Sequence, residues 1–224
     1  VGRLIRMHAE RMEDINEAAG ICIDRLDWIR MFNERADDGI SCYKGKKTGS
    51  LIISWNEISD SISAIVHSND KVVLVNNHSK RIDILKNVDG IFDEFTFAGT
   101  SLNLTAFLCI NKPALGWTAK SSNVTSVGGD SFMQKYLYMG VFPMCPFPGN
   151  DHSIRPSGAD KYYLDYGPLM KLMQGAEWVL KPHVVSATNF SAKVNLFKIE
   201  SGYSIPVVHA TENTVEVILK DIDI

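Results

Sequence analysis

Short apolar runs that break off into polar, chemically capable residues are the most constraining feature of this sequence. Three of these runs lie in the first half of the chain, and a fourth ends at a tryptophan. The runs are Gly20-Ile21-Cys22-Ile23 before Asp24, Val72-Val73-Leu74-Val75 before Asn76, Gly90-Ile91-Phe92 before Asp93, and Pro113-Ala114-Leu115-Gly116 before Trp117. Strands that are buried on both faces of a parallel sheet have continuous apolar sequences, whereas half-exposed strands alternate. The runs therefore predict parallel strands with functional residues at their carboxyl ends.

Helical patterns separate these predicted strands. Apolar residues at helical spacing predict helices over residues 3–18, 56–68, 80–87, 101–110 and 130–140. Strands that alternate with helices of about ten residues indicate βαβ units and a parallel sheet. Residues 34–50 are polar and rich in glycine and lysine, and they predict a long loop on the carboxyl side of the first strand.

The chain changes character after the last of these helices. Residues 145–163 are rich in proline, glycine and polar side chains, and a helix is expected over 165–175. Strand-like segments then follow without helices between them, at residues 178–185, 192–197, 203–208 and 214–219. Such a series predicts an antiparallel β unit. We therefore expect an α/β part over residues 1–175 and a small antiparallel β part over 176–224.

Composition and charge exclude several classes of protein. With 45% hydrophobic and 22% charged residues, the 224-residue chain has the composition of an ordinary globular domain. A net charge of −3 without a basic stripe argues against a nucleic-acid partner. No apolar stretch approaches the roughly 20 residues of a membrane helix, so no membrane partner is expected. The four cysteines lack C-x-x-C spacing, which argues against a zinc site and leaves the cellular compartment undecided.

The sequence contains none of the common cofactor motifs. A P-loop, a G-x-G-x-x-G turn and a G-x-S-x-G elbow are all absent. A metal site formed by Asp24, His78, Asp93 and His152 is a competing idea, but the six histidines show no H-x-H or H-E-x-x-H spacing. We therefore expect neither a cofactor nor a metal.

Two carboxylates follow the first apolar run. Asp24 ends the run directly, and Asp27 lies one turn later beside Trp28, an aromatic ring that can form a platform for a sugar. Carboxylates are rarely buried without partners, so these two are expected to be hydrogen-bonded or catalytic. The structural alternative is an ion pair with Arg25 or Arg30, or a helix cap.

A second pair of carboxylates, Asp93 and Glu94, ends the third apolar run. Adjacent carboxylates repel each other, which favours the protonated form of one of them. A proton donor of this kind is what general acid catalysis near neutral pH requires. The alternative is that one of the two is a solvated loop acid, because neighbouring side chains on a strand point to opposite faces.

Polar and aromatic residues near these strand ends suit a carbohydrate. Asn76 and Asn77 can exchange hydrogen bonds with sugar hydroxyls, although an Asn-Asn pair also favours a turn. Trp117 can stack on the apolar face of a sugar or lie in the core. Asp151 and His152 belong to the Pro/Gly-rich segment, which can reach a site at the end of the sheet.

The sequence Gly-Ile-Cys-Ile-Asp-Arg-Leu-Asp-Trp at residues 20–28, followed two strands later by Gly-Ile-Phe-Asp-Glu at residues 90–94, resembles the second half of a (β/α)8-barrel glycoside hydrolase. The nearest clan is that of the α-galactosidases and related α-glycosidases. In that clan the nucleophilic aspartate ends the fourth strand, often as Lys-x-Asp, and the acid/base aspartate ends the sixth. Arg25-Leu26-Asp27 is similar to the first pattern with arginine for lysine, and Asp93 lies at the acid/base position. These enzymes also tend to carry a C-terminal antiparallel β domain, similar to residues 178–224.

The resemblance implies an α/β fold that is the second half of a TIM-type barrel, from its fourth to its eighth strand, with a small antiparallel β domain. It implies a glycoside hydrolase with a carbohydrate substrate and no cofactor. The nucleophile would be Asp27 or Asp24, the acid/base Asp93 or Glu94, and the sugar would be positioned by Arg25, Trp28, Asn76 and Trp117. Since the first three strands would be missing, we expect a fragment, a partner chain or a homo-oligomer.

Two other functions remain compatible with the sequence. A non-catalytic carbohydrate-binding or scaffold protein on the same fold would keep the aromatic residues and use the carboxylates in structural contacts. A metal-dependent barrel hydrolase would need a divalent ion. Fold alone does not choose among these functions. An extracellular or periplasmic location would suit a glycan-degrading enzyme.

Overall fold

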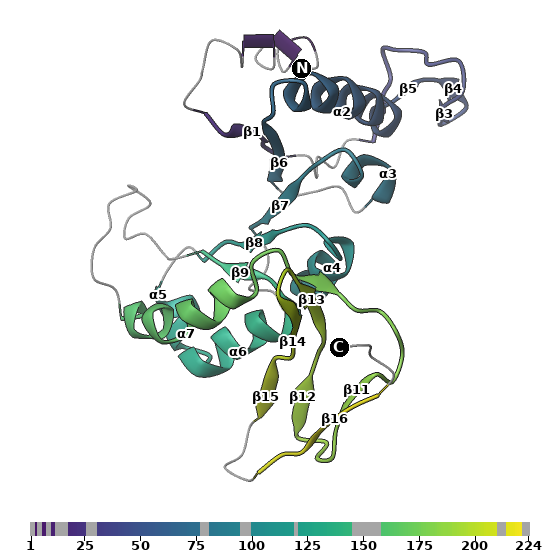
Figure 1. Ribbon diagram of the computed structural model, residues 1–224. Coiled ribbons are helices and arrows are strands. Elements are labelled where there is room, and N and C mark those ends of the chain that lie inside the picture. Colours follow the sequence, from purple (N-terminus) through teal and green to yellow (C-terminus); the bar gives the residue numbers. More distant parts are fainter. Residues whose placement is uncertain are drawn as a thin grey trace. The chain divides into compact units, whose positions relative to one another are not determined.

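The computed structural model of the chain (Figure 1) describes residues 18–25, 31–76, 81–94, 100–118, 121–144, 158–209 and 214–220, together with Arg3, Arg6, Met7, Glu10 and Arg11. The chain divides into two compact units, Val1–Phe92 and Asp93–Ile224. Most of the helix predicted over residues 3–18 lies outside the described residues.

A parallel sheet and two helices form the core of the first unit. The elements are β1 (Gly20–Ile23), α2 (Leu51–His67), β6 (Val72–Asn76), α3 (Ile82–Leu85) and β7 (Gly90–Asp93). Strand β6 pairs in parallel with both β1 and β7, so that Cys22 lies beside Leu74 and Val75 lies beside Ile91. The first three apolar runs therefore predicted these strands correctly, but the burial expected on both faces is found only in part: Cys22 and Val72 are exposed, and burial alternates along β6.

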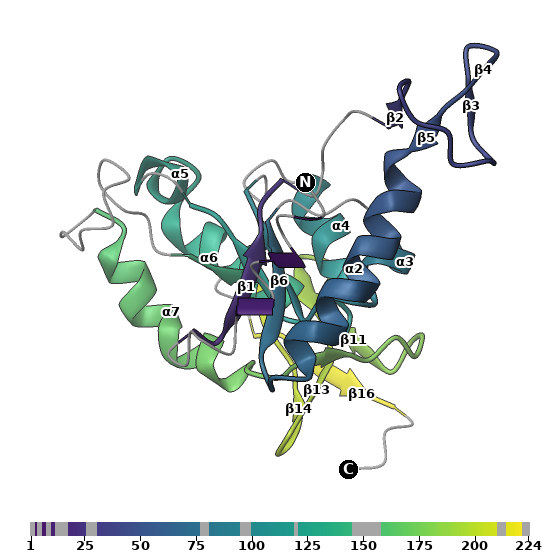
Figure 2. The same cartoon turned by 90° about the horizontal axis from the view of Figure 1, so that it is seen from above.

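Helix α2 packs beside β6 and is the longest helix among the described residues (Figure 2). Its residues Ile62 and Val66 are fully buried, as are Val73 and Val75 of β6. Burial of each of these four side chains contributes about 1.5–3 kcal/mol to the stability of the unit. The helix begins earlier than predicted because the Ser50 Oγ accepts a hydrogen bond from the backbone N–H of Ile53 at 3.4 Å and caps it.

One carboxylate ties the end of α2 to the start of β6. The Oδ2 atom of Asp89 accepts a hydrogen bond from the backbone N–H of Val73 at 2.7 Å and lies 2.8 Å from His67 Nε2. Because His67 is in the last turn of α2, this contact closes the helix-to-strand connection at the amino end of the sheet.

Residues 31–50 form two short antiparallel pairs instead of the long loop predicted over 34–50. Strand β2 (Phe32–Asn33) pairs with β5 (Gly49–Ser50), and β3 (Cys42–Tyr43) pairs with β4 (Lys46–Lys47). The prediction was wrong because these strands are two residues long, too short for an apolar alternation to be visible in the sequence.

The second unit begins with a mixed α/β region. Its elements are α4 (Thr100–Leu108), β8 (Ala114–Gly116), α5 (Ser121–Thr125), α6 (Gly129–Met139), β9 (Phe142–Pro143) and α7 (Asp160–Leu172). Strands β8 and β9 are parallel, with Leu115 beside Phe142. The predicted helices and the fourth apolar run are confirmed, whereas α5 and the very short β9 were not predicted.

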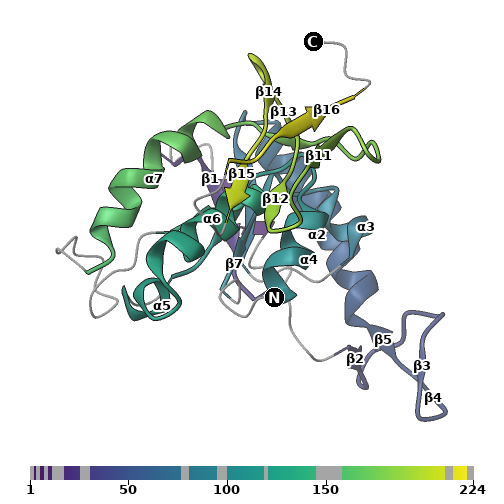
Figure 3. The ribbon, with the colours of Figure 1, turned by 90° about the horizontal axis from the view of Figure 1, so that it is seen from below.

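Helices α6 and α7 lie side by side (Figure 3). The hydroxyl of Tyr166 on α7 donates to Asp130 Oδ1 at 3.2 Å and accepts from Gln134 Nε2 at 3.3 Å. Gly129 allows the close approach, because a Cβ atom there would lie only 2.2 Å from the ring of Tyr162. The position therefore requires glycine.

Short antiparallel strands complete the second unit, as the sequence predicted. They are β10 (Glu177–Trp178), β11 (Val185–Ala187), β12 (Ala192–Val194), β13 (Phe197–Ile199), β14 (Gly202–Ser204), β15 (Val207–His209) and β16 (Val217–Leu219). They pair as β10-β13-β14, β11-β16 and β12-β15, so three of the four segments predicted from the sequence are each divided between two sheets, and the fourth, 214–219, contains β16. Asn195 between β12 and β13 donates from its Nδ2 to the carbonyl of Tyr138 at 2.9 Å, which attaches these strands to α6.

The parallel strands have the order β1-β6-β7-β8-β9, which is also their order in the sequence. The fold is therefore mixed α/β, with a five-stranded parallel sheet and small antiparallel sheets. The described strands do not close into a barrel. The expected division at residues 175 and 176 stays a prediction.

Of the helices that the structure describes, none has both the length and the apolar character that are needed to cross a lipid bilayer.

Candidate functional site

Asp24 and Asn76 meet in the first unit at the carboxyl ends of β1 and β6. The pairing of Ile23 with Val75 brings the residues that follow them, Asp24 and Asn76, side by side. The Nδ2 of Asn76 donates to Asp24 Oδ1 at 2.7 Å. This hydrogen bond holds the carboxylate of Asp24 in one orientation. Because Asp24 is exposed, the carboxylate remains accessible to solvent.

Arg25 turns the chain away from the sheet directly after Asp24. Its φ of 58° lies in the left-handed region, which costs a residue with a side chain roughly 1–2 kcal/mol. The side chain is exposed. Lost solvation and, secondarily, the negative charge of Asp24 raise the pKa of the Cys22 thiol two residues earlier.

Asp93 lies at the end of β7 with its side chain directed towards helix α4 of the second unit. It is only 2% exposed, and its Oδ2 accepts a hydrogen bond from the hydroxyl of Thr105, which is fully buried on α4. A buried carboxylate needs such partners, because an unpaired one carries a large desolvation penalty. Burial and the hydrogen bond from Thr105 give the carboxylate of Asp93 a structural role.

Glu94 and Trp117 follow the carboxyl ends of the neighbouring strands β7 and β8. The backbone N–H of Trp117 donates to the carbonyl of Asp93 at 2.9 Å, which in a parallel ladder pairs Asp93 with Gly116 and Glu94 with Trp117. Glu94 is in the turn that follows β7, and Trp117 comes directly after β8. Both Glu94 and Trp117 are half-buried, which leaves part of each available to a ligand.

Three further residues near Asp93 were not identified from the sequence. Thr105 holds its carboxylate, Thr118 is 2% exposed with no hydrogen-bond partner for its Oγ1 among the described residues, and Cys109 is buried. Burial raises the pKa of Cys109 to about 12, with a smaller contribution from Asp93 and an opposing one from Lys112. Nothing in the sequence indicated these residues, since their place depends on how α4 packs on the sheet.

The remaining candidates lie outside the described residues: Asp27, Trp28, Asn77, Asp151 and His152. The histidines of the competing metal hypothesis, His78 and His152, also fall there. Within the described part of the chain, no group of three or more histidine, cysteine, aspartate or glutamate side chains is arranged to hold a metal ion.

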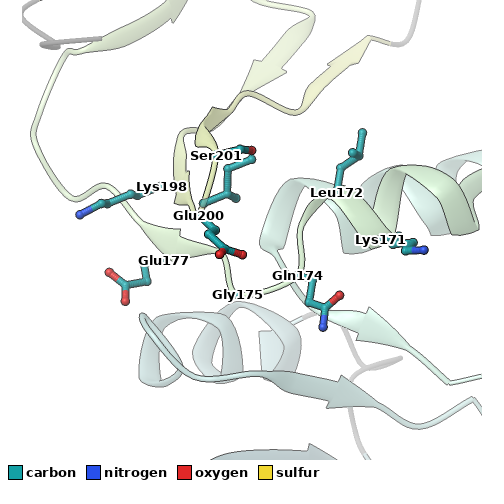
Figure 4. Close-up of a pocket in the computed structure, with 9 residues that line it drawn as sticks. Lys171, Leu172, Gln174, Gly175, Glu177, Lys198, Glu200 and Ser201 are labelled. Atoms are coloured by element: carbon teal, nitrogen blue, oxygen red, sulfur yellow. The ribbon is translucent and has the colours of Figure 1, made fainter.

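A separate cleft of about 880 Å³ lies in the second unit, between the end of α7 and the strands β10, β13 and β14 (Figure 4). Its polar lining includes Gln174, Glu177 and Glu200, together with Lys171 and Lys198. Glu177 is paired directly with Lys198 across the strands. None of the residues predicted from the sequence lines this cleft, and no aromatic ring does, so it lacks a stacking surface for a sugar.

Comparisons of this chain with protein-family models, with curated proteins and with solved structures give no match.

Proposed function

We propose that the chain is part of a glycoside hydrolase in which Glu94 is the acid/base and Trp117 is the platform on which a sugar ring stacks. The observation that supports this most is the hydrogen bond from the backbone N–H of Trp117 to the carbonyl of Asp93, which sets Trp117 opposite Glu94 just beyond the carboxyl ends of β7 and β8. A sugar stacked on the indole has its glycosidic oxygen near the neighbouring carboxyl group. Asp93 is less suited to this role, because its carboxylate is buried against Thr105.

The strand order supports a barrel as the complete fold. In doubly wound sheets the order of strands reverses at a switch point, whereas a barrel wall adds each strand after the previous one. The order β1-β6-β7-β8-β9 has no reversal. We therefore propose that these are the fourth to eighth strands of a (β/α)8 barrel, and that further strands close it.

The nucleophile in this proposal is Asp24 or Asp27. Asn76 holds the carboxylate of Asp24 through its 2.7 Å hydrogen bond, and in this role it positions the group that attacks the anomeric carbon or activates water. Glu94 then gives its proton to the leaving oxygen as the glycosidic bond breaks. Retention and inversion of the anomeric configuration are both compatible with this assignment of roles.

The first test is a screen of the full chain against nitrophenyl α- and β-glycosides, with and without a chelator. Chelator-resistant release of nitrophenol is the expected result. Release that requires a divalent ion would instead favour a metal-dependent hydrolase.

Two neighbouring variants then separate catalysis from structure. Glu94→Gln should lower turnover by about 10²–10⁴-fold at an unchanged Tm, because only the proton donor is lost. Asp93→Asn should lower the Tm, since it alters a buried hydrogen-bonded carboxylate. If Glu94→Gln keeps full turnover, the assignment of the acid/base is wrong.

A non-catalytic carbohydrate-binding protein is the second candidate. The observation that favours it is that Asp24 and Asp93 both accept hydrogen bonds from neighbouring side chains, Asn76 and Thr105. In this case glycans should bind without nitrophenol release, and Trp117→Ala should weaken binding whereas Glu94→Gln should leave it unchanged.

A further inference from the structure

We propose that residues 41–48, here called the lysine hairpin, bind the anionic groups of an acidic polysaccharide, and that the substrate of the proposed hydrolase is a chain of uronate or sulfated sugars. This inference rests on the proposed function. The lysine hairpin consists of β3, a two-residue turn, β4 and Thr48, within the first unit.

The charge of the lysine hairpin is opposite to that of the whole chain. Lys44, Lys46 and Lys47 carry three positive charges within four residues, and no acidic residue occurs in 41–48, whereas the chain has a net charge of −3. All three lysines are exposed. Lys47 lies 3.7 Å from Asp37 and its side chain is 80% exposed, so this ion pair is weak and open to competition.

Asp38, an acidic residue that precedes the lysine hairpin, stabilises the fold of this segment through hydrogen bonds. The carboxylate of Asp38 accepts hydrogen bonds from the backbone N–H of Ile40, Ser41 and Ser50, at 3.0, 2.6 and 2.7 Å, and from the Ser41 hydroxyl at 2.8 Å. These bonds hold the pKa of Asp38 far below its usual range. Asp38 therefore keeps its negative charge, but its oxygens are occupied by these four donors and it forms no ion pair with the lysines of the hairpin among the described residues.

The hairpin is also anchored by buried groups at its base. Thr48 is 1% exposed, and its hydroxyl donates to the carbonyl of Asn33 at 2.7 Å. The ring of Tyr43 stacks on Phe32 with centroids 5.0 Å apart. The lysines therefore project from an ordered scaffold, which lowers the entropic cost of binding compared with a flexible basic loop.

The turn of the lysine hairpin carries a conformational cost at a lysine. Lys44 and Gly45 have φ of 51° and 75°, as a two-residue hairpin turn with both central residues in the left-handed region requires. Asparagine, aspartate or glycine is favoured at the first position of such a turn, and lysine is strained there. Strained residues of this kind tend to occur at functional sites. Here the exposed Lys44 lies in the turn, with its ammonium group 5.0 Å from the centroid of the Tyr43 ring.

The location connects the lysine hairpin to the proposed site. The hairpin is part of the connection from β1 to α2, which leaves the sheet at the carboxyl end that carries Asp24 and Asn76. In α/β enzymes the loops at this end bind the substrate. Ammonium groups form charge-assisted hydrogen bonds with carboxylates and sulfates, whereas neutral sugars gain little from them.

The test is native electrophoresis of the full chain through gels that contain polygalacturonate, a sulfated glycan or a neutral glucan. The acidic glycans should retard the chain and the neutral one should not. Triple replacement of Lys44, Lys46 and Lys47 by glutamine should weaken binding of the acidic glycans about ten-fold, because each exposed charge pair contributes modestly. The matched control replaces Lys161, Lys193 and Lys198 of the second unit, which changes the net charge equally.

Several outcomes would overturn the proposal. Equal weakening in the hairpin and control variants would show a general effect of net charge. Equal retardation by duplex DNA would show an unspecific polyanion surface, and no retardation by either acidic glycan would remove the ligand class. Retardation that depends on the hairpin in a chain that hydrolyses no glycoside would keep the binding of acidic glycans by the lysine hairpin, but it would reject the hydrolase and with it the assignment of these glycans as its substrate.

Discussion

The side-chain amide of Asn76 holds the carboxylate of Asp24 at 2.7 Å, across the carboxyl ends of two adjacent parallel strands. Neither strand alone positions this carboxylate: β1 supplies the acid and β6 supplies its donor. A hydrogen bond to a charged group contributes about 1.5–3 kcal/mol, more than one between neutral groups. The pair therefore fixes a potential nucleophile without burying it.

Asn76→Ala should lower kcat/KM of the proposed hydrolase about ten-fold or more, since the loss of an oriented, charge-assisted hydrogen bond corresponds to at least one decade in rate. The Tm should change by only a few degrees, because the bond is exposed. Initial rates and thermal melts of the same preparation measure both. The control is Asn87→Ala, which removes an exposed Asn–Asp hydrogen bond to Asp60 elsewhere in the unit. An equal loss of activity in both variants would contradict the positioning role.

Thr105→Val should destabilise the second unit by about 1–3 kcal/mol, because it removes a buried hydroxyl donor from the carboxylate of Asp93. Valine has nearly the same shape as threonine, so the packing is conserved and the loss of stability reports the missing hydrogen bond. Thr105→Ser keeps the hydroxyl and should retain more of the stability. Urea unfolding followed by tryptophan fluorescence gives both values. A larger loss for the serine than for the valine variant would show that the methyl group matters more than the hydrogen bond.

Gly140→Ala should be strongly destabilising. Gly140 ends α6 with φ of 66°, and a Cβ atom there would lie 2.6 Å from the ring of Phe197, a core residue that cannot move aside cheaply. Gly175 is the matched control: its φ is 71°, but an added Cβ would meet nothing within 4 Å. Gly175→Ala should therefore cost only the backbone strain of roughly 1–2 kcal/mol. Similar melting temperatures for the two variants would show that the ring relaxes.

Asp38→Asn should lower the Tm at pH 7, because an amide cannot accept all of the hydrogen bonds that the carboxylate receives. The pKa of Asp38 is lower in the folded chain than its ordinary value of 3.8. Its stabilising effect is therefore present above that value, and it is lost as the pH falls below it towards the folded-state pKa. The difference in Tm between the two proteins should shrink below about pH 4. Glu57→Gln, an exposed change on α2, should show no such pH-dependent difference.

The sequence predicted the parallel strands well, because each is a short apolar run bounded by polar residues. The run Val72–Val75 marks β6 although Val72 is exposed, and such runs also located Asp24 and Asn76 at strand ends. The sequence could not separate the two adjacent acids: Asp93 is buried and accepts a hydrogen bond from Thr105, whereas Glu94 is half-buried in the turn that follows. This contact joins elements that are distant in the sequence, and local patterns contain no information on it.

Cys109 should resist alkylation in the folded protein, whereas Cys42 should react readily. Burial raises the pKa of Cys109 to about 12, so almost no thiolate is present at pH 8, and the sulfur is also inaccessible. Cys22 is exposed but its pKa is raised, so it should react more slowly than Cys42. A brief treatment with iodoacetamide, followed by peptide mapping, measures each cysteine separately. In urea all of them should be modified, and rapid labelling of Cys109 in the native protein would show that α4 opens locally.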